Sequence, residues 1–114
     1  MADNIFARIV AKEVPADIVY EDERALAFRD IQPHAPVHIL VVPKQTIARV
    51  SEARAGDEPL LGHLLTVAAE LARREGIDDT GYRLVINKGP HAGESVPHLH
   101  VHLLEGRPMA WPPG

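Results

Sequence analysis

The chain has no cysteine among its 114 residues. This excludes disulfide bonds, thiolate-bound zinc and cysteine nucleophiles, and it fits a reducing compartment. Long apolar runs are absent as well, because even the aliphatic run Ile39 to Val42 is far too short to cross a bilayer. The first residues, Met1 to Arg8, lack the basic segment and apolar core of a secretion signal. We therefore expect a soluble, cytoplasmic protein that has no membrane partner.

A strong charge of one sign is also missing. Twelve basic and sixteen acidic side chains leave a net charge of −4, so no overall field attracts nucleic acid or anionic lipid. We expect no nucleic-acid partner. With 46% hydrophobic and 25% charged residues, the composition is that of an ordinary globular protein. The length predicts one domain spanning residues 1–114, with the tail 105–114 included.

The hydrophobic pattern predicts two helices. Asp3 or Asn4 can cap a short helix, which must end before Pro15. A long helix begins near Asp57, which we predict as its N-cap, and ends at Gly76. Between and after the helices, five segments have the character of strands: 18–20, 25–28, 37–42, 82–87 and 96–104. Most connections are short, so the predicted fold is α+β, an antiparallel sheet of about five strands with one long and one short helix.

The last predicted strand carries the most unusual pattern in the chain. His98, His100 and His102 alternate with Leu99, Val101 and Leu103, so the imidazoles share one face of the strand and the apolar residues share the other. The apolar row can pack on the core. The histidine row is then free to meet a ligand.

Three interpretations of the histidine row compete. It could be a solvated strand face, although imidazole is an unusual choice there. It could bind a metal, but alternate strand residues lie about 6.6 Å apart and three in a straight row do not easily converge on one ion, so we predict no metal. The third interpretation is nucleophilic catalysis, because an imidazole with a pKa near 6.5 is largely neutral at pH 7. Gly89 and Gly93 could let the nearby loop approach a phosphate.

The run His98-Leu-His-Val-His-Leu-Leu104 resembles the histidine triad signature, in which three histidines alternate with apolar residues. Further segments, among them Ala27-Phe-Arg-Asp-Ile31 and the closing Trp111-Pro-Pro-Gly114, are similar to the Hint branch of the histidine triad (HIT) superfamily, the histidine triad nucleotide-binding proteins. The resemblance covers essentially the whole chain. It implies a homodimer of HIT-like fold that needs no cofactor and hydrolyses purine nucleoside 5′-phosphoramidates, typically adenosine ones, to a nucleoside monophosphate such as AMP and an amine.

The same resemblance implies roles for individual residues. His100 corresponds to the nucleophile that forms a nucleotidyl-histidine intermediate, His102 to a phosphate or proton-transfer partner, and His98, with His38, to orienting groups. Ser95 corresponds to the hydroxyl that faces the phosphate and the leaving amine. The implied nucleotide-binding residues are Asp30 at the ribose, Asn87 near ribose and phosphate, the base slot of Ile5, Phe6, Ile9, Phe28 and Ile31, and Ser95, Val96 and His102 around the phosphate.

Two residues depart from the family pattern. Glu94 stands where glutamine is more usual and adds a negative charge beside the incoming phosphate, and Arg29 stands beside the base slot where histidine is common. Two further hypotheses remain open for the function: a dinucleoside polyphosphate hydrolase, and a nucleotide-binding regulatory or scaffold protein in which hydrolysis is incidental.

Overall fold

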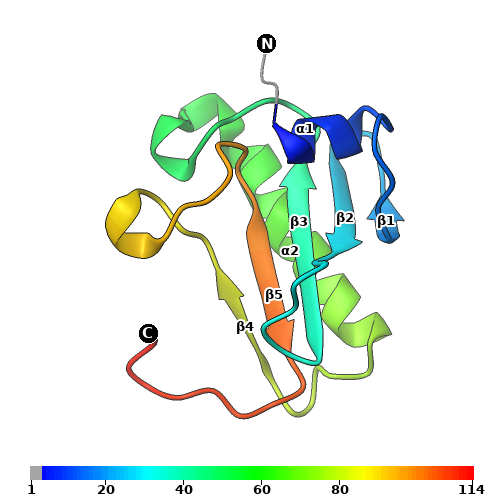
Figure 1. The fold of residues 1–114 in the computed structure, drawn as a ribbon, viewed down its shortest axis with the longest axis vertical. Helices are drawn as coiled ribbons and strands as arrows, with labels where there is room; N and C mark the ends of the chain where they lie inside the picture. The colour runs from blue at the N-terminus through cyan, green and yellow to red at the C-terminus, as the bar shows by residue number, and fades with distance from the viewer. Residues whose placement is uncertain (1–3) are drawn as a thin grey trace.

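The computed structural model describes residues 4–114. Five strands form one sheet with the order β1-β2-β3-β5-β4, and every neighbouring pair is antiparallel. The predicted α+β class and the five-stranded antiparallel sheet are confirmed (Figure 1). The strands are β1 Ile18–Glu21, β2 Ala25–Arg29, β3 Val37–Pro43, β4 Tyr82–Val85 and β5 Val101–Glu105. The helices are α1 Ile5–Val10 and α2 Glu58–Arg74. Two short 3-10 turns, η1 Val50–Glu52 and η2 Ala55–Asp57, precede α2, and a third, η3 Pro90–Ala92, lies between β4 and β5.

The short helix α1 lies on one face of the sheet, near the upper end of β3 in Figure 1. The Asn4 side chain accepts the backbone N–H of Ala7 at 2.8 Å and so caps the helix. Asp3, the alternative cap, lies outside the described residues. Phe6 and Ile9 of α1 pack on Leu26, Phe28, Leu40 and Val42, which are alternate residues of β2 and β3.

The long helix α2 covers the opposite face of the sheet, behind it in Figure 1. Its buried residues Leu60, Leu64, Val67 and Leu71 recur at helical spacing and form the main core with Val41, Val101 and other strand residues. Asp57 is the N-cap residue, but its side chain makes no capping bond to α2. Instead it accepts the backbone N–H of Arg54 at 2.9 Å, because the turn η2 immediately before the helix uses the same carboxylate.

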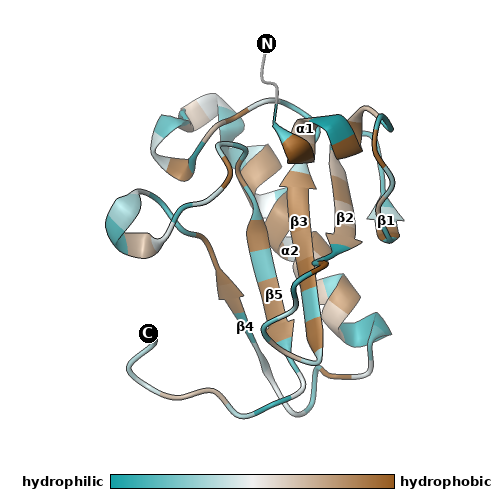
Figure 2. Cartoon of the chain, in the orientation of Figure 1, coloured by the Kyte–Doolittle hydropathy of each residue, from teal (hydrophilic) through white to brown (hydrophobic). Residues whose placement is uncertain are grey.

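The histidine segment is a strand over only half of its predicted length. β5 begins at Val101, not at residue 96, and its ladder with β3 starts at the Val41–Val101 pair. The next residues of β3 lead to Pro43, which has no N–H to donate, and the backbone N–H of Leu99 bonds to Ile47 O instead, at 2.7 Å. The predicted alternation still holds where the ladder is lost, since Leu99 belongs to the α2 core. Alternating bands of hydropathy along β5 are visible in Figure 2.

One glycine fixes the end of β5. Gly106 has φ +98°, and a Cβ atom there would lie 2.8 Å from the Cβ of Pro36. The chain therefore turns away from the sheet at a position where only glycine fits. Beyond it, Arg107 donates to His34 O at 3.1 Å and Arg83 donates to Ala110 O at 3.0 Å. Within residues 4–114, no helix has the length and apolar character needed to cross a membrane.

Candidate active site

A cavity of about 760 Å³ opens on the α1 face of the sheet. This volume lies within the range of small-molecule sites. The cavity draws its lining from both ends of the chain and from the middle. All ten residues predicted to bind the nucleotide line it: Ile5, Phe6, Ile9, Phe28, Asp30, Ile31, Asn87, Ser95, Val96 and His102. His38 lines it too, whereas His98 and His100 are not among the lining residues.

The predicted base slot forms the apolar part of this cavity, and its members differ in exposure. Phe6 and Phe28 are buried and meet edge to face, with ring centroids 5.3 Å apart. Ile9 is buried beside them, Ile5 is partly exposed, and Ile31 is 92% exposed. A planar aromatic ligand would therefore find fixed walls on the phenylalanine side and an open wall at Ile31.

His100 is buried, with 6% of its surface exposed, and it lies next to the cavity through its contact with the lining residue Phe6. Its ring stands nearly perpendicular to that of Phe6, with centroids 4.9 Å apart. Its Nδ1 lies 2.7 Å from the backbone oxygen of His98. A carbonyl oxygen can only accept, so Nδ1 carries the proton and Nε2 of a neutral His100 carries the lone pair. The bond fixes the ring and leaves Nε2 as the nucleophilic nitrogen.

The side chain of His98 is held by the end of strand β3. It is 1% exposed, and its Nε2 donates to Pro43 O at 2.9 Å. Its Nδ1 has no hydrogen-bond partner within the described residues. The side chain of His98 thus anchors the unpaired segment to β3, while its main-chain oxygen orients His100.

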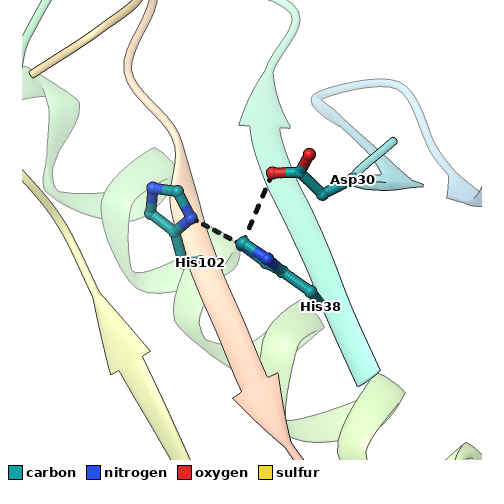
Figure 3. Close-up of side chains that lie close together, drawn as sticks. All are labelled: Asp30, His38 and His102. Atoms are coloured by element: carbon teal, nitrogen blue, oxygen red, sulfur yellow. Dashed lines mark hydrogen bonds and ion pairs between the residues drawn. The ribbon is translucent and has the colours of Figure 1, made fainter. Parts of the chain in front are cut away.

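Three side chains meet across the sheet, where His38 and His102 share a hydrogen bond and Asp30 lies within ion-pair distance of His38. His38 Nε2 lies 2.9 Å from His102 Nδ1 and 3.5 Å from Asp30 Oδ2. Figure 3 shows the three side chains pointing toward one another, from β3, β5 and the residue that follows β2. The His38–His102 contact spans 64 positions of the sequence, so pairing of β3 with β5 creates it.

The positions of the protons on His38 and His102 follow from one backbone donor, the N–H of His34. The N–H of His34 donates to His38 Nδ1 at 3.1 Å, so a neutral His38 carries its proton on Nε2. That proton is donated to His102 Nδ1, which places the proton of a neutral His102 on Nε2. In Figure 3, the second ring nitrogen of His102 points away from His38. Since His102 lines the cavity, it can offer that N–H to an anion.

Burial keeps these imidazoles neutral. Desolvation lowers the pKa of His102 to about 4, with a further contribution from the neighbouring His100 and His38. Desolvation also lowers the pKa of His98. It lowers the pKa of His38 as well, although the negative charge of Asp30 acts in the opposite direction. At neutral pH these rings are therefore uncharged donors and acceptors with defined tautomers.

The two residues that depart from the family pattern both make ion pairs. The Arg29 guanidinium forms two bonds of 3.0 Å with the Glu75 carboxylate at the end of α2. The Glu94 carboxylate is paired with Arg49. Both charged groups are therefore already paired, although Arg29 is among the residues that line the cavity.

Asp30, His38 and His102 are also the residues that could hold a metal ion. One ligand atom from each lies within 4.8 Å of the other two, and imidazole and carboxylate are suitable zinc ligands. However, His102 Nδ1 and His38 Nε2 already satisfy each other at 2.9 Å. A metal would have to replace that bond. The grouping contains only one histidine of the alternating row, His102.

The sequence did not reveal two main-chain groups of the site. The His34 N–H sets the tautomer of His38, and the His98 carbonyl sets that of His100. Almost every residue has the same backbone N–H and C=O groups, so the sequence does not show which of them belong to a site. Among side chains, His34 itself lines the cavity, and its place between Pro33 and Pro36 in the loop before β3 was the available signal.

An antiparallel sheet covered by one long helix, with a row of three alternating histidines beside a cavity, defines the histidine triad class of proteins. The chain belongs to the HIT family: the model of the HIT domain matches residues 11–109. A solved HIT family hydrolase from Legionella pneumophila superposes with a TM-score of 0.96 at 46% identity, covering 98% of this chain and 100% of that one.

Two curated relatives differ in what their names state. Purine nucleoside phosphoramidase of Escherichia coli is 49% identical over 107 residues, which is 94% of this chain and 90% of the relative. The 14 kDa zinc-binding protein of Zea mays is 54% identical over 112 residues, 96% of this chain and 87% of the relative. The fold is thus that of HIT family hydrolases.

Proposed function

We propose that the chain hydrolyses purine nucleoside 5′-phosphoramidates through a covalent intermediate on His100. The observation that carries the proposal is the 2.7 Å bond from His100 Nδ1 to the His98 carbonyl, which leaves the lone pair on Nε2. The 49% identity with a purine nucleoside phosphoramidase supports the substrate class. No observation favours the dinucleoside polyphosphate or scaffold alternatives over this one.

The substrate occupies the cavity with its purine in the Phe6–Phe28 slot and its ribose at Asp30. A carboxylate can accept hydrogen bonds from both hydroxyls of the ribose diol. Asn87 and Ser95 lie toward the phosphate end. The neutral His102 donates its Nε2 proton to a phosphate oxygen, where negative charge gathers during the reaction.

In the first step, the lone pair of His100 Nε2 attacks the α-phosphorus, and the phosphorus–nitrogen bond to the amine breaks. The departing nitrogen takes a proton from solvent water, relayed through the Ser95 hydroxyl, and leaves as a neutral amine. In the second step, a water molecule attacks the phosphorus and gives up one proton to solvent, which replaces the proton consumed in the first step. The bond to His100 breaks, its electron pair returns to Nε2, and the nucleoside monophosphate is released. His100 returns to its starting tautomer because the His98 carbonyl holds the Nδ1 proton throughout.

The test is turnover of an adenosine 5′-phosphoramidate that carries a fluorescent amine. We expect turnover by the wild type that is unaffected by a strong chelator, and a loss in His100→Ala that exceeds the 10²–10⁴-fold typical of general acid–base groups. His98→Ala and His102→Ala should lose less. Equal and mild losses in all three variants would contradict covalent catalysis. Loss of wild-type activity with chelator would instead point to a metal at Asp30, His38 and His102.

A further inference from the structure

The loop between β4 and β5 is closed by its own glutamate. The Gly89 N–H donates to Glu94 Oε1 at 3.0 Å, and the Glu94 N–H donates to Gly89 O at 3.1 Å. Gly93 adopts the left-handed conformation, with φ +76°, which lets the loop fold back in this way. Gly93 and Ser95 line the cavity on either side of Glu94, while Glu94 does not.

Arg49 clamps this loop from a distant part of the chain. Its Nε lies 3.1 and 3.2 Å from the two oxygens of the Glu94 carboxylate, and its Nη2 donates to Oε2 at 3.0 Å. Arg49 follows β3 and is 45 positions from Glu94. Its Nη1 bonds to Glu52 at 2.5 Å, so the guanidinium itself is fixed. The Glu94 side chain is only 14% exposed.

The ion pair of Arg49 and Glu94 also determines the protonation of the carboxylate beside the cavity. Hydrogen bonding to Arg49, helped by the Gly89 N–H, lowers the pKa of Glu94. The carboxylate is therefore ionised at neutral pH, next to the position where a phosphate would bind. Both of its oxygens face donors, and the guanidinium balances its charge.

We propose that Arg49 is a positioning and charge-balancing residue for the phosphate end of the site, an inference that rests on the proposed phosphoramidate hydrolysis. It holds the Gly89–Ser95 loop, and with it the Ser95 hydroxyl, against the cavity. It also neutralises Glu94, so that the site accepts an anionic phosphate and does not select leaving amines by their charge. Without Arg49, the carboxylate repels anionic leaving groups and attracts cationic ones.

The experiment compares two adenosine 5′-phosphoramidates, one whose amine carries a carboxylate and one whose amine carries an ammonium group. In Arg49→Gln we expect kcat/KM for the carboxylate substrate to fall about tenfold relative to the ammonium substrate, mainly through KM. The cause is the charge of Glu94, which no longer has its arginine partner. The double variant Arg49→Gln with Glu94→Gln removes both charges and keeps an amide pair. It should restore the wild-type ratio to within about twofold, which a merely structural role would not do.

Lys44→Ala is the matched control. Lys44 also follows β3 and forms a partly buried ion pair, with Glu21 at 2.7 Å, but Glu21 belongs to β1, whereas the partner of Arg49 stands between the lining residues Gly93 and Ser95. We expect its substrate ratio to equal that of the wild type. An Arg49→Gln protein that folds, by its thermal unfolding, and keeps the wild-type ratio would overturn the proposal. If Arg49→Gln does not fold, Glu94→Gln and the double variant decide, since Glu94→Gln removes a negative charge beside the cavity while Arg49 stays paired with Glu52, and the ratio must then move toward the carboxylate substrate.

Two readouts separate this inference from the proposed function. Amide hydrogen exchange at Gly89 and calorimetric binding of AMP require no turnover. If the wild type hydrolyses neither substrate, the proposed function fails, but Arg49→Gln should still speed Gly89 exchange and weaken AMP binding about tenfold, with AMP binding restored in the double variant. Unchanged exchange and unchanged AMP binding would reject the role of Arg49 itself.

Discussion

At the scale of single residues, the chain places neutral imidazoles where unfolded chains would have partly protonated ones. His38, His98 and His102 all have a lowered pKa, and desolvation is the largest cause for each. The sequence predicted which histidines share a face, because alternation is a local property. It could not predict their protonation, since that depends on burial and on partners such as Pro43 O and the His34 N–H, which the fold supplies.

These shifts make folding sensitive to mild acid. Between pH 6.5 and about 4, unfolded His102 binds a proton that the folded protein does not, so stability falls as the pH falls through this window. At about 1.4 kcal/mol per pKa unit, His102 contributes roughly 3 kcal/mol to this loss. Urea unfolding at pH 7.5, 6, 5 and 4.5 should show the decline, and a clearly shallower one in His102→Gln. His91→Gln, which removes an exposed histidine in η3, should follow the wild type; equal slopes in all three proteins would refute the assignment.

At the scale of elements, hydrophobic periodicity predicted the helices and the positions of the strands along the chain, and the short connections predicted antiparallel pairing, whereas the order of the strands in the sheet was not predicted. The predicted ends of two strands were wrong, because backbone hydrogen bonding there does not follow the alternation of apolar and polar side chains. Residues 96–100 alternate like a strand but have no ladder, because Pro43 cannot donate and Leu99 pairs with Ile47. Likewise β4 ends at Val85 rather than at Asn87, and Asn87 is thereby left at the cavity.

The end of β5 provides a test of local backbone geometry. Gly106→Ala would place a methyl group 2.8 Å from Pro36 at φ +98°, and we expect a loss of about 1–3 kcal/mol in the free energy of unfolding. Gly62→Ala is the opposite case, since Gly62 lies inside α2 with nothing within 4 Å of an added Cβ. It should gain about 0.5–1 kcal/mol from helix propensity. Denaturant unfolding of both variants checks the pair, and a Gly106→Ala protein as stable as the wild type would contradict the geometry.

At the scale of the whole molecule, the homodimer implied by the family resemblance stays a prediction. β4 ends the sheet on one side with no further strand among residues 4–114, and Leu65 of α2 and Ile86 after β4 are 44% and 41% exposed. An unpaired edge strand and exposed apolar side chains favour contact with a second copy. The single domain of residues 1–114, with its tail, is likewise still a prediction.

Sedimentation at micromolar concentration should give twice the 12.5 kDa mass of the chain. Leu65→Glu should raise the dissociation constant at least about tenfold, because the interface would have to bury a charge. Ile18→Glu, on β1 at the opposite edge of the sheet, should leave the dimer intact. A wild-type monomer in this concentration range would exclude the predicted assembly.

The cavity also ties function to the completion of the chain. Asn4 Nδ2 donates to Pro97 O at 3.4 Å across 93 positions of sequence, and Phe6 packs on His100. During synthesis, helix α1 cannot make its contacts with residues 97–100 until these residues have left the ribosome, and the cavity cannot close before then. A growing chain therefore lacks the closed cavity, and a fragment that stops before residue 97 contains the residues of the predicted base slot but none of the three alternating histidines.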